Sequence, residues 1–271
     1  MELFMRFPGF KTKALTLSYD DGVIYDKKLI EILNRRRIKC TFNLNSGIKN
    51  DPRRIPEDEI KQVYAGHEIA VHTLTHPHLE NLTKAEMAQE IIEDRKNLEA
   101  ITGGIVDGMA YPFGLADTVG EPELAAECGI CYSRTVAATH SFALPKDFLR
   151  WNPTCHHNDS MLSELTERFL APDDRAHPWR IRPSVFYLWG HSYEFNDSDN
   201  WDIIESFCKK AGGNDAVWYA TNGEIAHYSN AFLRIEKSAD GKTVYNPTAI
   251  RLYFVAAGSE ITLEPGGYAK L

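Results

Sequence analysis

Two histidines four residues apart are the first feature of this sequence that could do chemistry. His72 and His76 can turn their imidazoles toward one point, either on a helix or in a tight turn. Zinc and similar ions bind such nitrogens together with a carboxylate. The pair alone also fits two surface or capping histidines, so a metal site needs a partner from elsewhere in the chain.

Two adjacent carboxylates, Asp20 and Asp21, can supply that partner. They precede Gly22, and Asp-Asp-Gly alone is also good turn chemistry. Two buried carboxylates side by side repel each other, and a cation relieves that cost. One Asp with His72 and His76 makes three protein ligands with open positions, the catalytic type of metal site. The other Asp then stands where a general base for an attacking water belongs.

A further histidine, His191, follows an apolar run. Residues 185–189 predict a strong strand, which leads through Gly190 into His191. A single histidine in an apolar segment also fits a hydrogen-bonded core residue. On the same face as the other groups, His191 becomes a general-acid candidate, because the pKa of imidazole lies near neutrality.

Strand-like and helix-like segments alternate along the chain up to about residue 230. The pattern predicts about seven βα units and therefore a parallel sheet. Asp20, His72 and His191 each come at the end of a predicted strand. In a parallel βα barrel these strand ends meet on one face, where sites are built. We therefore expect side chains distant in sequence to meet there.

The last part of the chain has a different pattern. Turn-rich dipeptides separate short apolar runs, which predicts a small β-rich appendage. We expect a barrel domain at residues 1–230 and an extension packed on it at 231–271. The strands expected in the extension lie near residues 232–235, 242–245, 250–255 and 261–263.

Four short motifs resemble, in order, those of the polysaccharide deacetylases with a NodB-homology domain, carbohydrate esterase family four. They are LSYDDG at 17–22, HTLTH at 72–76, AYPFG at 110–114 and LWGH at 188–191. Each motif alone is common, but the combination is specific. The resemblance spans about residues 14–192 and implies an α/β fold, a distorted (β/α) barrel of about seven strands.

The resemblance also implies the parts of a metal site. Asp21, His72 and His76 correspond to the family's metal ligands. One divalent metal is implied, with zinc in first place and cobalt, nickel or manganese as alternatives. The implied substrate is an N- or O-acetylated sugar.

Three further residues match the family's catalytic groups. Asp20 corresponds to the base, His191 to the acid, and Phe113 to the residue whose backbone N–H binds the oxyanion. We also expect Tyr111, Pro112, Trp151 and Trp189 to contact substrate, although the aromatic rings fit core packing equally well.

Two positions depart from the family pattern. The third motif usually carries an Arg that orients the base, and Ala110 stands there instead. The fourth motif is not evident, but Arg150 and Trp151 lie at about its place. We predict that the guanidinium of Arg150 replaces the missing one and hydrogen-bonds Asp20. A surface arginine is the alternative.

Together these features predict a metal-dependent hydrolase that removes acetyl groups from a carbohydrate. There are two alternatives, since a fold does not fix a substrate: a hydrolase of a small amide or imide, and a non-catalytic sugar-binding module.

The net charge of −8 argues against a broad nucleic-acid surface. No run approaches the roughly 20 apolar residues of a membrane span. The first twelve residues lack a signal peptide's apolar core, so we expect a cytoplasmic protein if they begin the native chain.

The five cysteines do not suggest a disulfide framework, because their number is odd and their spacing wide. Cys128 and Cys131 form one C-x-x-C pair. A zinc or redox pair is possible for this spacing, but we interpret it as two small core thiols at a helix–strand junction.

Overall fold

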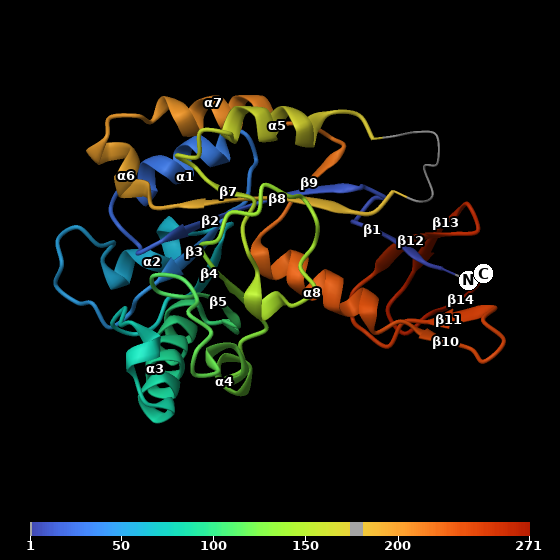
Figure 1. The fold of residues 1–271 in the computed structure, drawn as a ribbon, viewed down its shortest axis with the longest axis horizontal. Helices are drawn as coiled ribbons and strands as arrows, with labels where there is room; N and C mark the ends of the chain where they lie inside the picture. The colour runs from blue at the N-terminus through green and yellow to red at the C-terminus, as the bar shows by residue number, and fades with distance from the viewer. Residues whose placement is uncertain (1, 174–180) are drawn as a thin grey trace.

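A curled sheet of parallel strands forms the centre of the protein (Figure 1). The computed structural model describes residues 2–173 and 181–271. Within them, this sheet runs through β6 (Tyr132–Arg134), β5 (Gly108–Ala110), β4 (Glu68–Val71), β3 (Thr41–Leu44), β2 (Lys13–Asp20), β8 (Ser184–Gly190) and β7 (Cys155–His156), and β9 (Val217–Tyr219) also pairs with β2.

Strand β2 lies in the middle of the sheet, and all eight of its residues are buried. It pairs along nearly its whole length with β8, and its other edge is shared by β9 near the start and β3 near the end. A parallel strand covered on both faces is buried throughout, as here. Asp20, the last residue of β2, therefore stands at the centre of the carboxyl edge of the sheet.

The two outer strands of the sheet are linked by one short segment. Trp151 bridges to Arg134 of β6, and β7, four residues later, pairs with β8. This segment curls the sheet into a distorted barrel. The predicted α/β barrel of about seven strands is confirmed.

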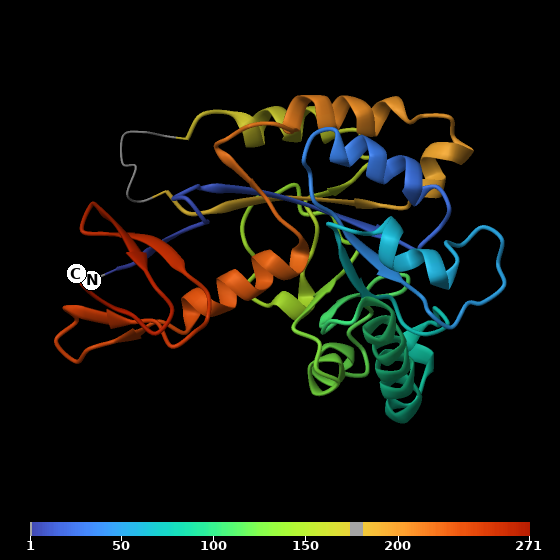
Figure 2. The same cartoon turned by 180° about the vertical axis from the view of Figure 1, so that it is seen from behind.

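Helices cover the outside of the sheet (Figures 1 and 2). The longest described helix is α3 (Lys84–Thr102), where Thr83 and Glu86 form a capping box and Gly103, with φ 77°, ends the helix. The helices are α1 (Asp26–Asn34), α2 (Glu57–Val63), α3 (Lys84–Thr102), α4 (Glu121–Glu127), α5 (Leu162–Leu170), α6 (Ser192–Asp197), α7 (Asp202–Ala211) and α8 (Asn222–Leu233), with 3-10 turns η1 (Leu79–Asn81) and η2 (Phe148–Arg150). No helix in the described residues is long and apolar enough to cross a membrane.

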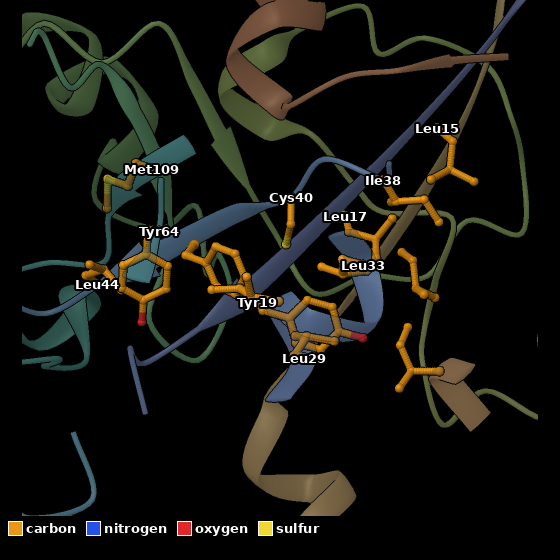
Figure 3. Packing of buried hydrophobic residues seen from close by; sticks show 14 of the residues in the cluster. Leu15, Leu17, Tyr19, Leu29, Leu33, Ile38, Cys40, Leu44, Tyr64 and Met109 are labelled. Atoms are coloured by element: carbon orange, nitrogen blue, oxygen red, sulfur yellow. The ribbon is translucent and has the colours of Figure 1, made fainter. Parts of the chain in front are cut away.

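Side chains of β2 alternate between the helical layer and the barrel interior, as the period of a strand requires. Leu15, Leu17 and Tyr19 belong to the main apolar cluster, together with Leu29 and Leu33 of α1 (Figure 3). The intervening side chains are polar and hydrogen-bonded inside the barrel. Thr16 donates to Asn222 at 2.7 Å, and Asn43 donates to Ser18 at 2.7 Å. Asp20 continues this inward-facing polar row.

The C-terminal residues form two small antiparallel sheets beyond α8 (Figure 1). One contains β1 (Phe4–Arg6), β12 (Leu252–Ala256) and β13 (Ser259–Leu263), and the other contains β10 (Glu236–Lys237), β11 (Thr243–Tyr245) and β14 (Tyr268–Lys270). The strand expected at 232–235 is wrong, because α8 continues to Leu233 and β10 starts only at Glu236. The N-terminal β1 shares a sheet with the C-terminal strands, and the domain division near residue 230 stays a prediction.

Candidate active site

Three strand ends bring a carboxylate and two imidazoles together. Asp20 ends β2, His72 follows β4, and His191 follows β8. The Nε2 atoms of His72 and His191 each lie 3.8 Å from Oδ2 of Asp20. Parallel strands thus place side chains from distant parts of the sequence at one carboxyl edge.

Asp21, His72 and His76 form a compact set of possible metal ligands. One ligand atom from each lies within 4.8 Å of the others. Nδ1 of His72 is 2.7 Å from the carbonyl oxygen of Ala110. Since a carbonyl only accepts hydrogen bonds, Nδ1 is assigned the proton, which leaves the lone pair on Nε2 for a metal.

The charge state of this set also suits a metal ion. Burial lowers the pKa of His72 to about 4 and lowers that of His76 below its ordinary value. Neutral imidazole is the form that binds metals. A carboxylate and two neutral imidazoles therefore fit a divalent ion such as Zn²⁺, with coordination positions left for other ligands.

The backbone around these ligands is strained. His76 lies in a loop rather than on a helix, with φ 60°, and its N–H is bonded to Oγ1 of Thr73 at 3.2 Å. Thr73, Asp21 and Phe113 have φ angles of 63°, 82° and 59°. Non-glycine residues rarely adopt this left-handed region, and such strain gathers at functional sites. The two histidines thus approach each other through a tight turn, one of the two arrangements expected from their spacing.

Asp20 is held by two buried donors. Nδ2 of Asn43 donates to its Oδ1 at 2.7 Å, and Arg134 donates to its Oδ2. Burial alone would raise the pKa of Asp20, but the Arg134 guanidinium, and then His72 and His191, outweigh burial and lower it. The Asp20 carboxylate is therefore ionised at neutral pH.

The predicted contact between Arg150 and Asp20 is wrong. The guanidinium of Arg150 binds three other carboxylates, those of Asp117, Asp147 and Glu123, each at 2.8 Å. Its side chain is 34% exposed. Residues 148–150 form the 3-10 turn η2, and this turn leaves the Arg150 side chain at the surface.

Arg134, at the end of β6, occupies the place predicted for Arg150. Its side chain is fully buried, and its Cζ lies 4.3 Å above the ring of Trp189. Sequence reasoning missed this residue, although it ends its strand in the same way that Asp20 ends β2. The strand-end pattern could therefore have found it.

His191 is positioned by a second carboxylate that sequence reasoning missed. It precedes α6, and its Nδ1 lies 3.3 Å from Oε2 of Glu194, which also lies 3.1 Å from Nε2 of His156. Burial would lower the pKa of His191, but Glu194, and then Asp20 and Asp21, outweigh burial and raise it. This rise favours the protonated form, which a general acid requires.

Phe113 presents its backbone at the edge of the site. Among the described residues, its N–H has no hydrogen-bond partner, so it can donate to a ligand. Its ring stands 4.5 Å from that of His76 and stacks on His78 at 3.8 Å.

The residues expected to contact substrate differ in exposure. Tyr111 is buried, and its hydroxyl donates to the carbonyl of Leu149 at 2.9 Å. Trp151 is 2% exposed and packs against Tyr187 at 4.7 Å. Neither ring has a free face for a sugar, so these two predictions are wrong. Pro112 is buried as well, and Trp189 is partly exposed.

A cavity of about 660 Å³ opens beside Asp21. Its wall includes Asn45, Arg54, Tyr64 and residues of the loop from 48 to 57. A volume of this size accommodates a small ligand, and its polar groups can orient one.

The family model for polysaccharide deacetylases matches residues 8–132, the segment that contains Asp20, Asp21, His72 and His76. Over this segment the chain is similar to the polysaccharide deacetylase family. His191 and Arg134 lie outside the matched segment, and the tertiary structure alone brings them to it.

A relative of known name is also similar in sequence over part of this chain. The chain is 27% identical over 143 residues to a chitooligosaccharide deacetylase of Bradyrhizobium sp. (strain ANU 289), a match covering 51% of this chain and 60% of that protein. This chain therefore spans less than two thirds of the length of that relative.

Solved structures share the fold. The chitin deacetylase of the fungal pathogen Colletotrichum lindemuthianum superposes with a TM-score of 0.52 at 16% identity, over 83% of this chain and 89% of that one. Puue allantoinase superposes with a TM-score of 0.58 at 15% identity, over 82% and 91%.

Proposed function

We propose that this protein is a metal-dependent deacetylase acting on an N- or O-acetylated carbohydrate. One observation carries the proposal. Asp20 stands 3.8 Å from both His72 and His191, at the edge where Asp21 and His76 also gather. A base, an acid and a ligand set for a metal are what hydrolysis of an acetyl group needs. The match of residues 8–132 to the polysaccharide deacetylase model and the name of the Bradyrhizobium relative support this reaction class.

The metal would be one divalent ion, zinc in first place, with cobalt, nickel or manganese as alternatives. Asp21, His72 and His76 would hold it. When bound, it would polarise the acetyl carbonyl and lower the pKa of a neighbouring water.

Side chains of the protein would transfer the protons during hydrolysis. The Asp20 carboxylate, fixed by Asn43 and Arg134, accepts a proton from the attacking water. The N–H of Phe113 donates to the carbonyl oxygen as that oxygen gains negative charge. His191, whose protonated form is favoured by Glu194, then gives a proton to the leaving nitrogen or oxygen.

Acetate release from a panel of acetylated sugars tests the proposal. N-acetylated chitooligosaccharides and O-acetylated xylooligosaccharides are incubated with the protein as purified, after chelation, and after zinc or cobalt is restored. We expect release that chelation abolishes and the metal restores, with Asp20→Asn as the inactive control.

The two alternative functions are outcomes of the same experiment. Because an allantoinase shares this fold, allantoin is included as a non-sugar substrate. Turnover of allantoin without acetate release would overturn the proposal in favour of an amide hydrolase. Binding of the oligosaccharides without any turnover would favour a sugar-binding module.

A further inference from the structure

A second group of metal-ligating side chains lies at the opposite end of the strands. Asp107 directly precedes β5, Cys131 directly precedes β6, and His227 comes from α8. Both strand residues are thus at the amino edge of the sheet, whereas Asp20 and His72 stand at its carboxyl edge. One ligand atom from each of the three lies within 4.8 Å of the others. These three residues are called the amino-edge cluster.

The distances within the amino-edge cluster are close to those around one zinc ion. Nε2 of His227 lies 3.9 Å from Sγ of Cys131, and 3.3 and 3.2 Å from the two carboxylate oxygens of Asp107. Zinc bonds of about 2.3 Å to sulfur and about 2.0 Å to nitrogen and oxygen, at tetrahedral angles, separate such ligand atoms by about 3.3 to 3.6 Å. Only small side-chain movements are needed to surround an ion.

The arrangement favours a metal over a catalytic relay. In a nucleophile–histidine–carboxylate relay, the two partners contact different ring nitrogens. Here the Cys131 sulfur and the Asp107 carboxylate both approach Nε2 of His227. A proton cannot pass through the ring in this geometry. The three ligand atoms lie within 4.8 Å of one another, and a cation that replaces the protons of Cys131 and His227 would hold all three together.

Solvent can reach the amino-edge cluster, and a backbone hydrogen bond fixes two of its residues relative to each other. The backbone N–H of Cys131 donates to the carbonyl of Asp107 at 2.7 Å, which keeps these two ligands side by side. The side chains of Asp107 and His227 are 23% and 46% exposed, so an ion can enter from solvent. Cys128, the other half of the C-x-x-C pair, is buried and outside the cluster. The interpretation as two small core thiols therefore does not hold for Cys131, which is only partly buried.

We propose that Asp107, Cys131 and His227 bind one zinc ion, separate from the metal of the active site. Sulfur, imidazole and carboxylate are all zinc ligands, and three of them leave one position for water. The ion ties α8, which leads into the C-terminal sheets, to the barrel strands β5 and β6. Its role is to stabilise this junction, because a ligand that binds only the folded chain stabilises it.

Cobalt substitution separates this site from the active site. A thiolate bound to Co²⁺ gives a near-ultraviolet charge-transfer band, and Asp21, His72 and His76 contain no sulfur. We expect the intact chain to show the band on titration with Co²⁺, and added zinc to displace it. His76→Ala keeps the band, Cys131→Ser loses it, and the matched control Cys128→Ser retains it.

Zinc content and thermal unfolding provide a second readout. Cys131→Ser and, independently, His227→Asn should each hold one equivalent of zinc less than the parent chain. In the His76→Ala background, zinc should raise the unfolding midpoint, and adding Cys131→Ser should remove that rise. Circular dichroism in chelator establishes that each variant is folded. A parent chain without the band, or a band of equal strength in Cys131→Ser, would overturn the proposal.

Discussion

Arg134 donates a hydrogen bond to Oδ2 of Asp20, although 114 residues separate the two in the sequence. Both side chains are buried, and the ring of Trp189 lies against the guanidinium at 4.3 Å. The contact joins the end of β6 to the end of β2. It therefore fixes the orientation of the carboxylate that we propose as the base.

We expect Arg134→Lys to lower kcat by on the order of 100-fold, because a displaced base loses its alignment with the attacking water. Metal content should not change, since Arg134 is not among the three ligands. Arg150→Lys is the matched control. Its cluster with Asp117, Asp147 and Glu123 is at the surface, so its kcat should stay near that of the parent chain. Equal losses in the two variants would count against a positioning role for Arg134.

The same contact has a pH signature in Arg134→Gln. Arg134 lowers the pKa of Asp20, and a base works only above its pKa. Without the guanidinium the pKa rises, so the acidic limb of the kcat/KM profile should move to higher pH. A profile that only decreases in height would mean that Arg134 does not act on the ionisation of Asp20.

His76→Ala should lose the active-site metal and with it most activity. The imidazole is one of the three protein ligands that we propose, and the two that remain would bind an ion far more weakly. His78→Ala is the control, because His78 is near in sequence but pairs with Glu80 instead. Elemental analysis after dialysis measures both variants. Stoichiometric active-site metal in His76→Ala would exclude this ligand assignment.

Asp20→Asn should reduce turnover by roughly 10²- to 10⁴-fold, the usual contribution of a general base. An amide cannot accept the proton, yet it keeps the shape of the side chain. Metal content should remain that of the parent chain. If metal were lost in proportion to activity, Asp20 would be a ligand instead of the base.

His191→Ala should slow hydrolysis of an acetamide more than that of an activated acetate ester. An amine must be protonated to leave, whereas a phenolate leaves readily without a proton. The comparison uses an N-acetylated oligosaccharide and 4-nitrophenyl acetate. Equal losses on both substrates would contradict a general-acid role.

Glu194→Gln should narrow the pH range of activity from the alkaline side. Glu194 raises the pKa of His191, and a general acid works only below its pKa. Removing the carboxylate lowers that pKa, so activity should fall at a lower pH than in the parent chain. An unchanged alkaline limb would assign that limb to another group.

Much of the site follows from the sequence because of one property of parallel sheets. Residues directly after strands collect at one edge whatever the details of packing. That rule places Asp20, His72 and His191 together before any coordinates are known, and motif order strengthens it. Local signals are equally reliable, since the capping box of Thr83 and Glu86 depends only on residues three apart.

The tertiary structure decided which side chains from other elements face the site. The sequence offers both Arg134 and Arg150, and only the register of β6 and the turn at η2 show which one reaches Asp20. Trp151 is buried because its segment bridges the edges of the barrel, a pairing across strands that no local pattern encodes. The amino-edge cluster likewise exists only because α8 docks His227 beside β5 and β6. Side-chain direction across packed elements depends on register and docking, and sequence spacing determines neither.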